Sequence, residues 1–325
     1  MRAVFLTCLA GALWGTVGVA TQLMTAKEPL APGISALSRT GLGAIVLLCA
    51  VPVLKLARGS GPLPWGLLAL FGAAGAAFQI TLFASYTAVG VTITVIVTAC
   101  LPVVLVAGWD TAVARRPPDV VLAGAIVLAG AGVVLAGVGS GAVPAEVADP
   151  RSEAAGLALV ATSALAFAIV AIAGRALGAR MHPLRASGLG LAATAVVLTV
   201  GVSAGSLTSV PLTGRMTTSI GGGLSARDLL LLGYIGVVAT GGAYLAFVTG
   251  LSLARSATAG LAPTLIEPAV ATALAALVLH EQMTATALTG CLMIVAGMLA
   301  LSFGEGRWRT RSRRAQASIQ HGEPS

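Results

Sequence analysis

Charged residues are scarce in this sequence. Only 9% of its 325 residues are Asp, Glu, Lys or Arg, whereas a soluble domain carries about 25%. Hydrophobic residues make up 57%, more than a fold surrounded by water could bury without exposing large apolar patches. The composition excludes an ordinary soluble protein, and we expect a lipid bilayer to surround most of the chain.

Aromatic residues and cysteines are also few. Aromatics amount to 4%, and Gly alone occurs 41 times. Small residues let helices approach closely in a bilayer, where no hydrophobic force drives helices together. The cysteines lie inside apolar runs without metal-ligand spacing, so we interpret them as packing residues and predict no metal site. They are Cys8, Cys49, Cys100 and Cys291.

Motifs for nucleotides and catalysis are missing. There is no GxxxxGK[ST] string for ATP and no GxSxG nucleophile elbow. His280 and Glu281 begin an HExxH pattern, but its last position is Thr284, so a zinc protease is excluded. The formal net charge of +8 comes from basic residues that stand singly between apolar runs or near the end of the chain. We therefore predict neither an enzyme nor a cofactor, and no nucleic-acid partner.

Ten apolar stretches are long enough to cross a bilayer as helices, which takes about 20 residues each. The prediction is an all-α polytopic membrane protein, with turn residues at the breaks and two longer polar loops at 140–153 and 207–226. Residues 305–325 are polar and basic, and we expect them to be a disordered tail. The predicted spans lie near 3–24, 33–56, 64–86, 91–113, 119–139, 154–175, 184–206, 227–251, 256–279 and 284–304.

The distribution of positive charge predicts the orientation. If the first residue is inside, 14 of the 19 Lys and Arg residues fall on the inner side and 4 in outer loops, with Arg39 inside a span. Cytoplasmic loops carry the excess of Lys and Arg. We therefore predict a multi-pass plasma-membrane protein with both termini in the cytoplasm.

The two halves of the chain carry an internal repeat. Shifting the second half back by 166 residues places Pro268 on Pro102 and Thr264 on Thr98. Each half then holds five spans, an odd number, so the two copies are inverted in the membrane. We predict one five-helix repeat at 1–139, an outer linker at 140–153 and a second five-helix repeat at 154–304.

The paired prolines indicate a binding site at mid-membrane. Pro102 and Pro268 each leave the carbonyl four residues earlier, of Thr98 or Thr264, without its helical bond. Free backbone at this depth is found where protein or a water-filled cavity satisfies it. Interruptions at corresponding places in two halves point to a transport site, although simple packing kinks remain the alternative.

Glu267 is the most informative polar residue, because it lies halfway along the ninth span beside Pro268. Charged groups at this depth cost about 3 kcal/mol or more and usually face an internal path. Glu267 could couple transport to protons or bind a cationic group. The alternative is a carboxyl group that is hydrogen-bonded to a neighbouring helix as structural glue.

Other polar or aromatic residues are candidates for the same site. Arg39 lies early in the second span, where it either faces inward or snorkels to the headgroups. Trp14 lies mid-span between Gly11 and Gly15, where it either lines a cavity or packs. Gln22, Gln79, Tyr86 and Tyr244 could line the site or bond between helices. Asp110 we interpret as an interfacial residue, satisfied by water or Arg115.

These residues together resemble the drug/metabolite transporter superfamily, in particular its EamA-like members. The resemblance covers about residues 1–304 and implies two inverted five-helix repeats and export or exchange of small metabolites. The sequence departs from the family at Arg115, where the repeat implies a Glu, and at Phe167, which corresponds to Trp14 at an offset of 153. The matching pieces are Ala12-Leu13-Trp14-Gly15, Arg39, Ala254 to Ala259, Leu265-Ile266-Glu267-Pro268, His280-Glu281, Gly290 and Gly297.

The sequence as a whole predicts a secondary transporter. Its substrate would be a small molecule such as an amino acid or drug, moved by alternating access between the two repeats, with protons as the candidate coupling ion. A non-transporting scaffold or sensor on the same fold is the alternative. A homodimer is compatible with the sequence.

Overall fold

The computed structural model describes residues 1–24, 32–54, 62–115, 120–139, 150–203, 225–280 and 283–301, and in these residues the chain is all helix and turn. Nine helices of this described part are long and apolar enough to cross a membrane, and a tenth, Ala285–Leu301, is shorter. The ten predicted spans are therefore confirmed. The tail 305–325, Glu281 and most of the linker 140–153 lie outside the described residues.

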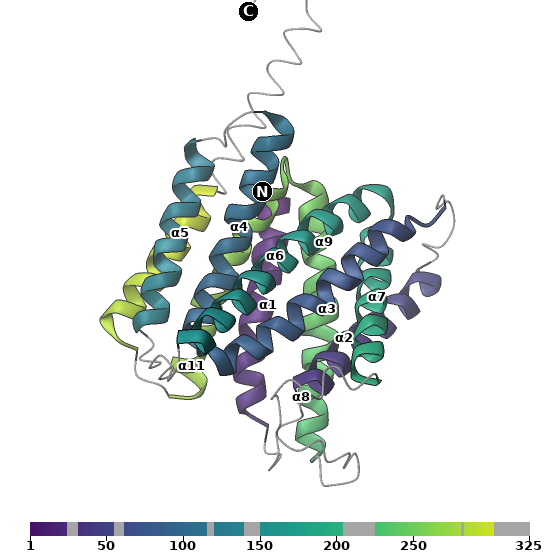
Figure 1. Ribbon diagram of the computed structural model, residues 1–325, viewed down its shortest axis with the longest axis horizontal. Coiled ribbons are helices and arrows are strands. Elements are labelled where there is room, and N and C mark those ends of the chain that lie inside the picture. The colour runs from purple at the N-terminus through teal and green to yellow at the C-terminus, as the bar shows by residue number, and fades with distance from the viewer. Residues whose placement is uncertain are drawn as a thin grey trace, which may run out of the picture.

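The first seven spans are single helices (Figure 1). Many large apolar side chains on them are exposed, among them Phe5, Val120 and Val127. That pattern suits a surface that faces lipid. The helices are α1 (Arg2–Gln22), α2 (Pro32–Val53), α3 (Trp65–Ala88), α4 (Val91–Ala114), α5 (Val120–Gly139), α6 (Pro150–Arg180) and α7 (Pro183–Ser203).

The eighth and ninth spans are interrupted. The eighth consists of α8 (Ala226–Gly236), a π-helical turn η1 (Val237–Gly242) and α9 (Ala243–Leu253). The ninth consists of α10 (Ala257–Leu261), a 3₁₀ turn η2 (Ala262–Ile266) and α11 (Glu267–Val278). By contrast, α4 continues as an α-helix through Pro102.

The expected pair of proline interruptions is thus present in one half only. The ninth span contains a second proline, Pro263, five residues before Pro268, so two backbone N–H groups are missing within a short stretch. The helix tightens to 3₁₀ geometry between them. A single proline in α4 leaves the neighbouring turns intact.

We call the two ends of the bundle the proximal and distal faces. The proximal face holds the start of α1 and the ends of α4 and α6, where Thr258 of α10 meets Asp110 of α4. The distal face holds the end of α5, where Thr284 donates to the carbonyl of Gly139 at 2.6 Å. Successive spans run in alternating directions between these faces (Figure 1).

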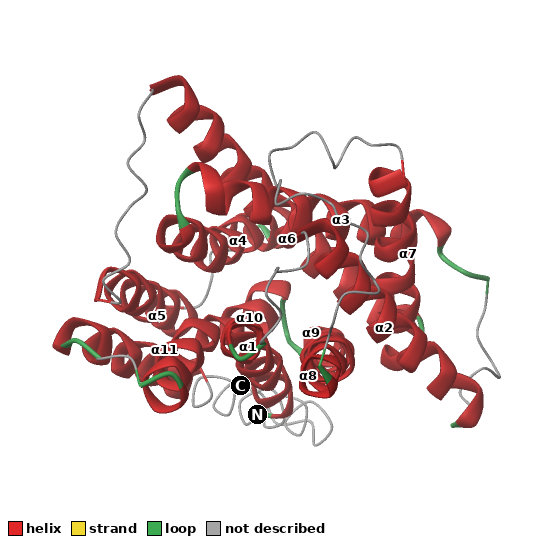
Figure 2. Cartoon of the chain, turned by 90° about the horizontal axis from the view of Figure 1, so that it is seen from below, coloured by secondary structure: helices red, strands yellow, loops and turns green. Residues whose placement is uncertain are grey.

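The helices pack in corresponding pairs. At one edge α2 packs against α7, and at the other α5 packs against the helix Ala285–Leu301 (Figures 1 and 2). Between these edges, α1 packs against α9 and α11, while α6 packs against α3 and α4. Replacing each span by the one five places further along converts one set of partners into the other. The packing of spans one to five is therefore repeated in spans six to ten.

Two glycines bring α1 against the broken ninth span. A Cβ atom on Gly11 would lie 2.8 Å from the carbonyl oxygen of Thr264, and one on Gly15 would lie 2.6 Å from the carbonyl oxygen of Glu267. Only glycine permits this approach, as expected of a small-residue pair four positions apart. The carbonyl of Thr264, which Pro268 cannot bond, is therefore covered by α1.

Candidate functional site

Arg39 of α2 is held in place by α3. Its Nε and Nη2 atoms donate to Oε1 of Gln79 at 3.2 and 3.0 Å. The amide nitrogen of Gln79 in turn donates to Oγ1 of Thr40 at 3.2 Å, so the orientation of the amide is fixed. The guanidinium also lies 5.9 Å from the ring centre of Phe83, within cation–π range. These contacts direct Arg39 into the bundle.

Glu267 occupies the first position of α11, directly after the 3₁₀ turn. Its carboxyl group has no hydrogen-bond partner or direct ion pair in the described part of the chain. The carboxyl oxygens are nevertheless not sealed off, because the one unpartnered and fully buried side-chain atom among the described residues is Nη1 of Arg185. Glu267 is surrounded by protein yet half-buried, so its carboxylate faces an internal space.

Arg39 and Glu267 share this internal space with two tyrosines. The guanidinium and the carboxylate attract each other across it, and both interact electrostatically with Tyr86 and Tyr244. Arg39, like Glu267, is enclosed by the bundle but half-buried. Arg39 and Glu267 form no direct ion pair. The carboxylate of Glu267 and the remaining Nη1 group of Arg39 can therefore each bind a group of opposite charge.

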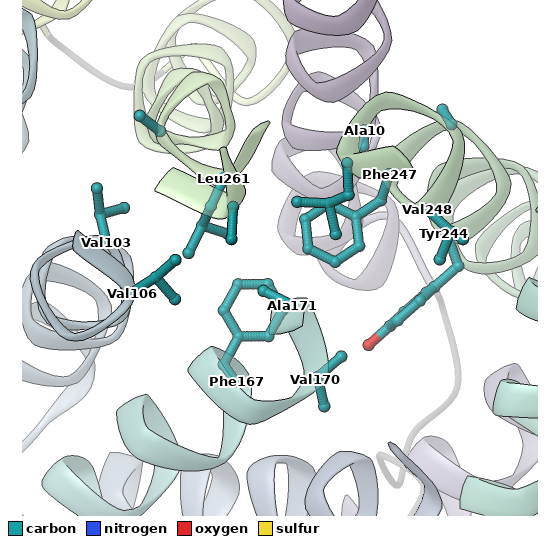
Figure 3. Close-up of a cluster of buried hydrophobic side chains, with 14 of the residues drawn as sticks. Ala10, Val103, Val106, Phe167, Val170, Ala171, Tyr244, Phe247, Val248 and Leu261 are labelled. Carbon is teal, nitrogen blue, oxygen red and sulfur yellow. The ribbon is translucent and has the colours of Figure 1, made fainter. Parts of the chain in front are cut away.

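An aromatic cluster closes one side of this space. The ring of Trp14 makes edge contacts with Phe167, Tyr244 and Phe247 at centroid separations of 5.7, 5.5 and 5.2 Å. Phe167 and Phe247 stack at 5.8 Å (Figure 3). Trp14 remains partly accessible, and its ring contact with Tyr244 joins it to the residues that interact with Arg39 and Glu267.

The threonines and prolines of the two repeats play a smaller part than expected. Thr98 Oγ1 donates to the carbonyl of Thr94 at 2.7 Å, and Thr264 Oγ1 donates to that of Leu261 at 2.8 Å, both within their own helix. Pro102 and Pro268 are buried. Thr98 keeps partial accessibility, whereas Thr264 is 7% exposed and packs against α1.

Burial differs between the two halves of the ninth span. Every residue from Ala257 to Leu265, on the proximal half, is buried. Every residue from Val270 to Ala276, on the distal half, is partly accessible around the whole helix. On the proximal half α10 packs against α4, α9 and α1 and η2 packs mainly against α1, whereas α11 packs against α1 and α5. The proximal half of the ninth span is therefore enclosed by protein, and the distal half is not.

Two further polar residues have partners that the sequence alone does not assign. Tyr86, a possible lining residue from the sequence, interacts with Glu267 and Arg39. Asp110, near the end of α4, is satisfied by Thr258 rather than by Arg115: its Oδ2 accepts from the backbone N and the hydroxyl of Thr258. A search for a helix-capping acid opposite a Ser-x-Thr start could have found this contact, but the pairing of α4 with α10 is set by tertiary packing.

Ten apolar helices around an enclosed pair of opposite charges define a multi-pass membrane protein with a polar site in its interior. Comparison with known proteins supports this class. Residues 154–303 match the EamA-like transporter family. Over these residues the chain is similar to the EamA-like transporter family, which confirms the resemblance predicted from the sequence for this half.

The fold also has counterparts among solved structures. One crystal structure superposes with a TM-score of 0.72, covering 92% of this chain and 98% of the other at 18% sequence identity. At that identity the likeness establishes the shared fold. A comparison with functionally curated proteins found no match.

Proposed function

We propose that this protein is a secondary transporter that exports or exchanges small metabolites through the space between its two halves. The observation that carries the proposal is the unpartnered carboxylate of Glu267, facing the same enclosed space as Arg39. A buried charge without a partner is costly and is retained where it serves a pathway. We place the protein in the plasma membrane with both termini, and hence the proximal face, in the cytoplasm.

The chemistry of the site supports solutes that carry both charges, such as amino acids and related drugs. An anionic group would bind Arg39, which offers a guanidinium fork already oriented by Gln79. A cationic group would bind Glu267, and an apolar body would lie against Trp14. The first half, 1–139, supplies three of these four residues, in keeping with its proposed role as an EamA-like repeat.

Proton coupling through Glu267 extends the proposal. A carboxylate that faces the space can exchange its proton for a substrate ammonium group, which links the movement of the two. Glutamine has the same shape but cannot release a proton. Glu267→Gln should therefore abolish transport driven by a pH gradient and retain exchange between labelled and unlabelled substrate.

The experiment uses purified protein in liposomes, with amino-acid mixtures as the probe. Thr272→Val is the control, because its hydroxyl donates to the carbonyl of Pro268 one turn away and leaves Glu267 untouched. Gradient-driven uptake by Glu267→Gln at the unchanged rate would refute the coupling. Absence of any uptake or exchange by the unchanged protein would favour a scaffold or sensor.

A further inference from the structure

Two polar side chains close the proximal end of the bundle. Asp110 of α4 accepts from the backbone N of Thr258 at 2.8 Å and from its hydroxyl at 2.7 Å. Arg175 of α6 donates from Nη1 to the carbonyls of Leu251 and Ala254 at 2.9 and 2.7 Å. The two side chains also attract each other. These four bonds join α4 and α6 to the end of α9 and the start of α10.

These bonds hold α10, the first part of the ninth span, in place at the proximal end of the bundle. Ser256 caps α10 by accepting from the backbone N of Ala259 at 3.1 Å, and Asp110 occupies the neighbouring N–H group. The residues that follow, Ala257 to Leu265, are all buried. Because hydrogen bonds to charged groups are stronger than neutral ones, separating α4 from α10 requires breaking the strongest contacts at this end.

At the distal end, the described residues that correspond to Asp110 and Arg175 are of a different kind. The 166-residue offset that aligns Thr258 with Thr92 places Ala276 opposite Asp110, and the 153-residue offset that aligns Phe167 with Trp14 places Gln22 opposite Arg175. Ala276 has no polar side chain, and Gln22 is exposed. At these corresponding positions, charged side chains join the helices at the proximal face but not at the distal face.

We propose that Asp110 and Arg175 form a one-sided latch, which positions α10 against α4 and holds the transporter closed at the proximal face and open at the distal face. The inference rests on the proposed alternating access. The latch bonds exist only in the proximally closed conformation. They therefore lower its free energy relative to that of the proximally open conformation. Weakening the latch should move the population toward the proximally open state.

The test is accessibility of a single cysteine at mid-membrane. Thr98→Cys, in a background where the four native cysteines are replaced, serves as the reporter because Thr98 is partly accessible and bonds only within its helix. A membrane-impermeant maleimide is applied to right-side-out and to inverted vesicles. In the unchanged protein we expect labelling mainly from the distal side.

Asp110→Ala and Arg175→Met should each raise labelling from the proximal side about tenfold and lower labelling from the distal side, because loss of a charged hydrogen bond shifts a two-state equilibrium by about that factor. Thr258→Val should have a smaller effect in the same direction, since the backbone bond to Asp110 persists. The controls are Thr111→Val, whose hydroxyl bonds within α4, and Arg180→Met, which is exposed on α6.

The reciprocal change distinguishes a latch from general loosening. A misfolded variant would be labelled faster from both sides, and that result, or unchanged labelling from both sides, overturns the latch. Equal effects of Arg175→Met and Arg180→Met would also overturn it. If the reporter in otherwise unchanged protein is labelled from neither side, the internal space itself is absent and the proposed function fails together with the latch.

Discussion

At the scale of single residues, the site depends on how Arg39 is held. Its guanidinium reaches the internal space because Gln79 accepts from two of its nitrogens and is itself fixed by Thr40. Gln79 is 4% exposed, so its role is to orient Arg39 from within the protein. Arg39 therefore does not snorkel to the headgroups, the alternative that the sequence left open.

Replacing Gln79 by leucine should destabilise the protein by about 1–3 kcal/mol, because it removes the acceptor of a charged side chain. Thr81→Val on the same helix should change stability little, since the Thr81 hydroxyl donates to the carbonyl of Ala77 within α3. The melting temperatures of the two purified variants in detergent provide the comparison. Equal melting temperatures would contradict the role of Gln79.

At the scale of helices, the contact between α1 and the ninth span organises the centre of the bundle. Gly11 and Gly15 lie against the backbone of η2 and α11, and Trp14 between them reaches the aromatic cluster. The break at Pro263 and Pro268 places Glu267 at the start of a new helix. This contact joins the acidic and aromatic parts of the site.

Gly15→Ala should destabilise the protein by about 1–3 kcal/mol, because the new Cβ would meet the carbonyl oxygen of Glu267, a backbone atom that cannot rotate away. Gly18→Ala is the matched control on the same helix. No atom lies within 4 Å of a Cβ at Gly18, so alanine there should keep or slightly raise the melting temperature. Equal loss of stability in both variants would contradict close packing at Gly15.

Much of this element-level structure could be predicted from the sequence, because it depends on local signals. Hydropathy located all ten spans, and the Gly11–Gly15 spacing predicted a close helix contact. The 3₁₀ turn is partly predictable from Pro268. The repeat pairs Pro268 alone with Pro102, so it gives no indication of the effect of Pro263. That match also led to the expectation of a break in α4, where a single proline is accommodated.

The site was harder to predict, since it depends on which helix faces which. Depth in the membrane singled out Glu267 and Arg39. Their common space, the support of Arg39 by Gln79 and the bond from Thr258 to Asp110 follow from packing between distant segments. These contacts join residues that are far apart in the chain, and no local sequence pattern indicates which helices face each other.

At the scale of the whole molecule, the orientation follows from charge. The 14 to 4 distribution of Lys and Arg predicts that the proximal face is cytoplasmic. Alkaline phosphatase fused after residue 325 should be inactive, and the same enzyme inserted in the loop 207–226 should be active. The opposite pattern would reverse the orientation and with it the direction in which the latch works.

The central claim is that Glu267 and Arg39 face one shared pathway through the membrane. It is tested most directly by comparing small molecules in the medium of cells that produce the unchanged protein, Glu267→Gln or no protein, at equal amounts in the membrane. We predict that a set of solutes bearing both an ammonium and a carboxylate group accumulates outside cells with the unchanged protein, and that the variant alters this set. Identical media in all three cases would contradict the account.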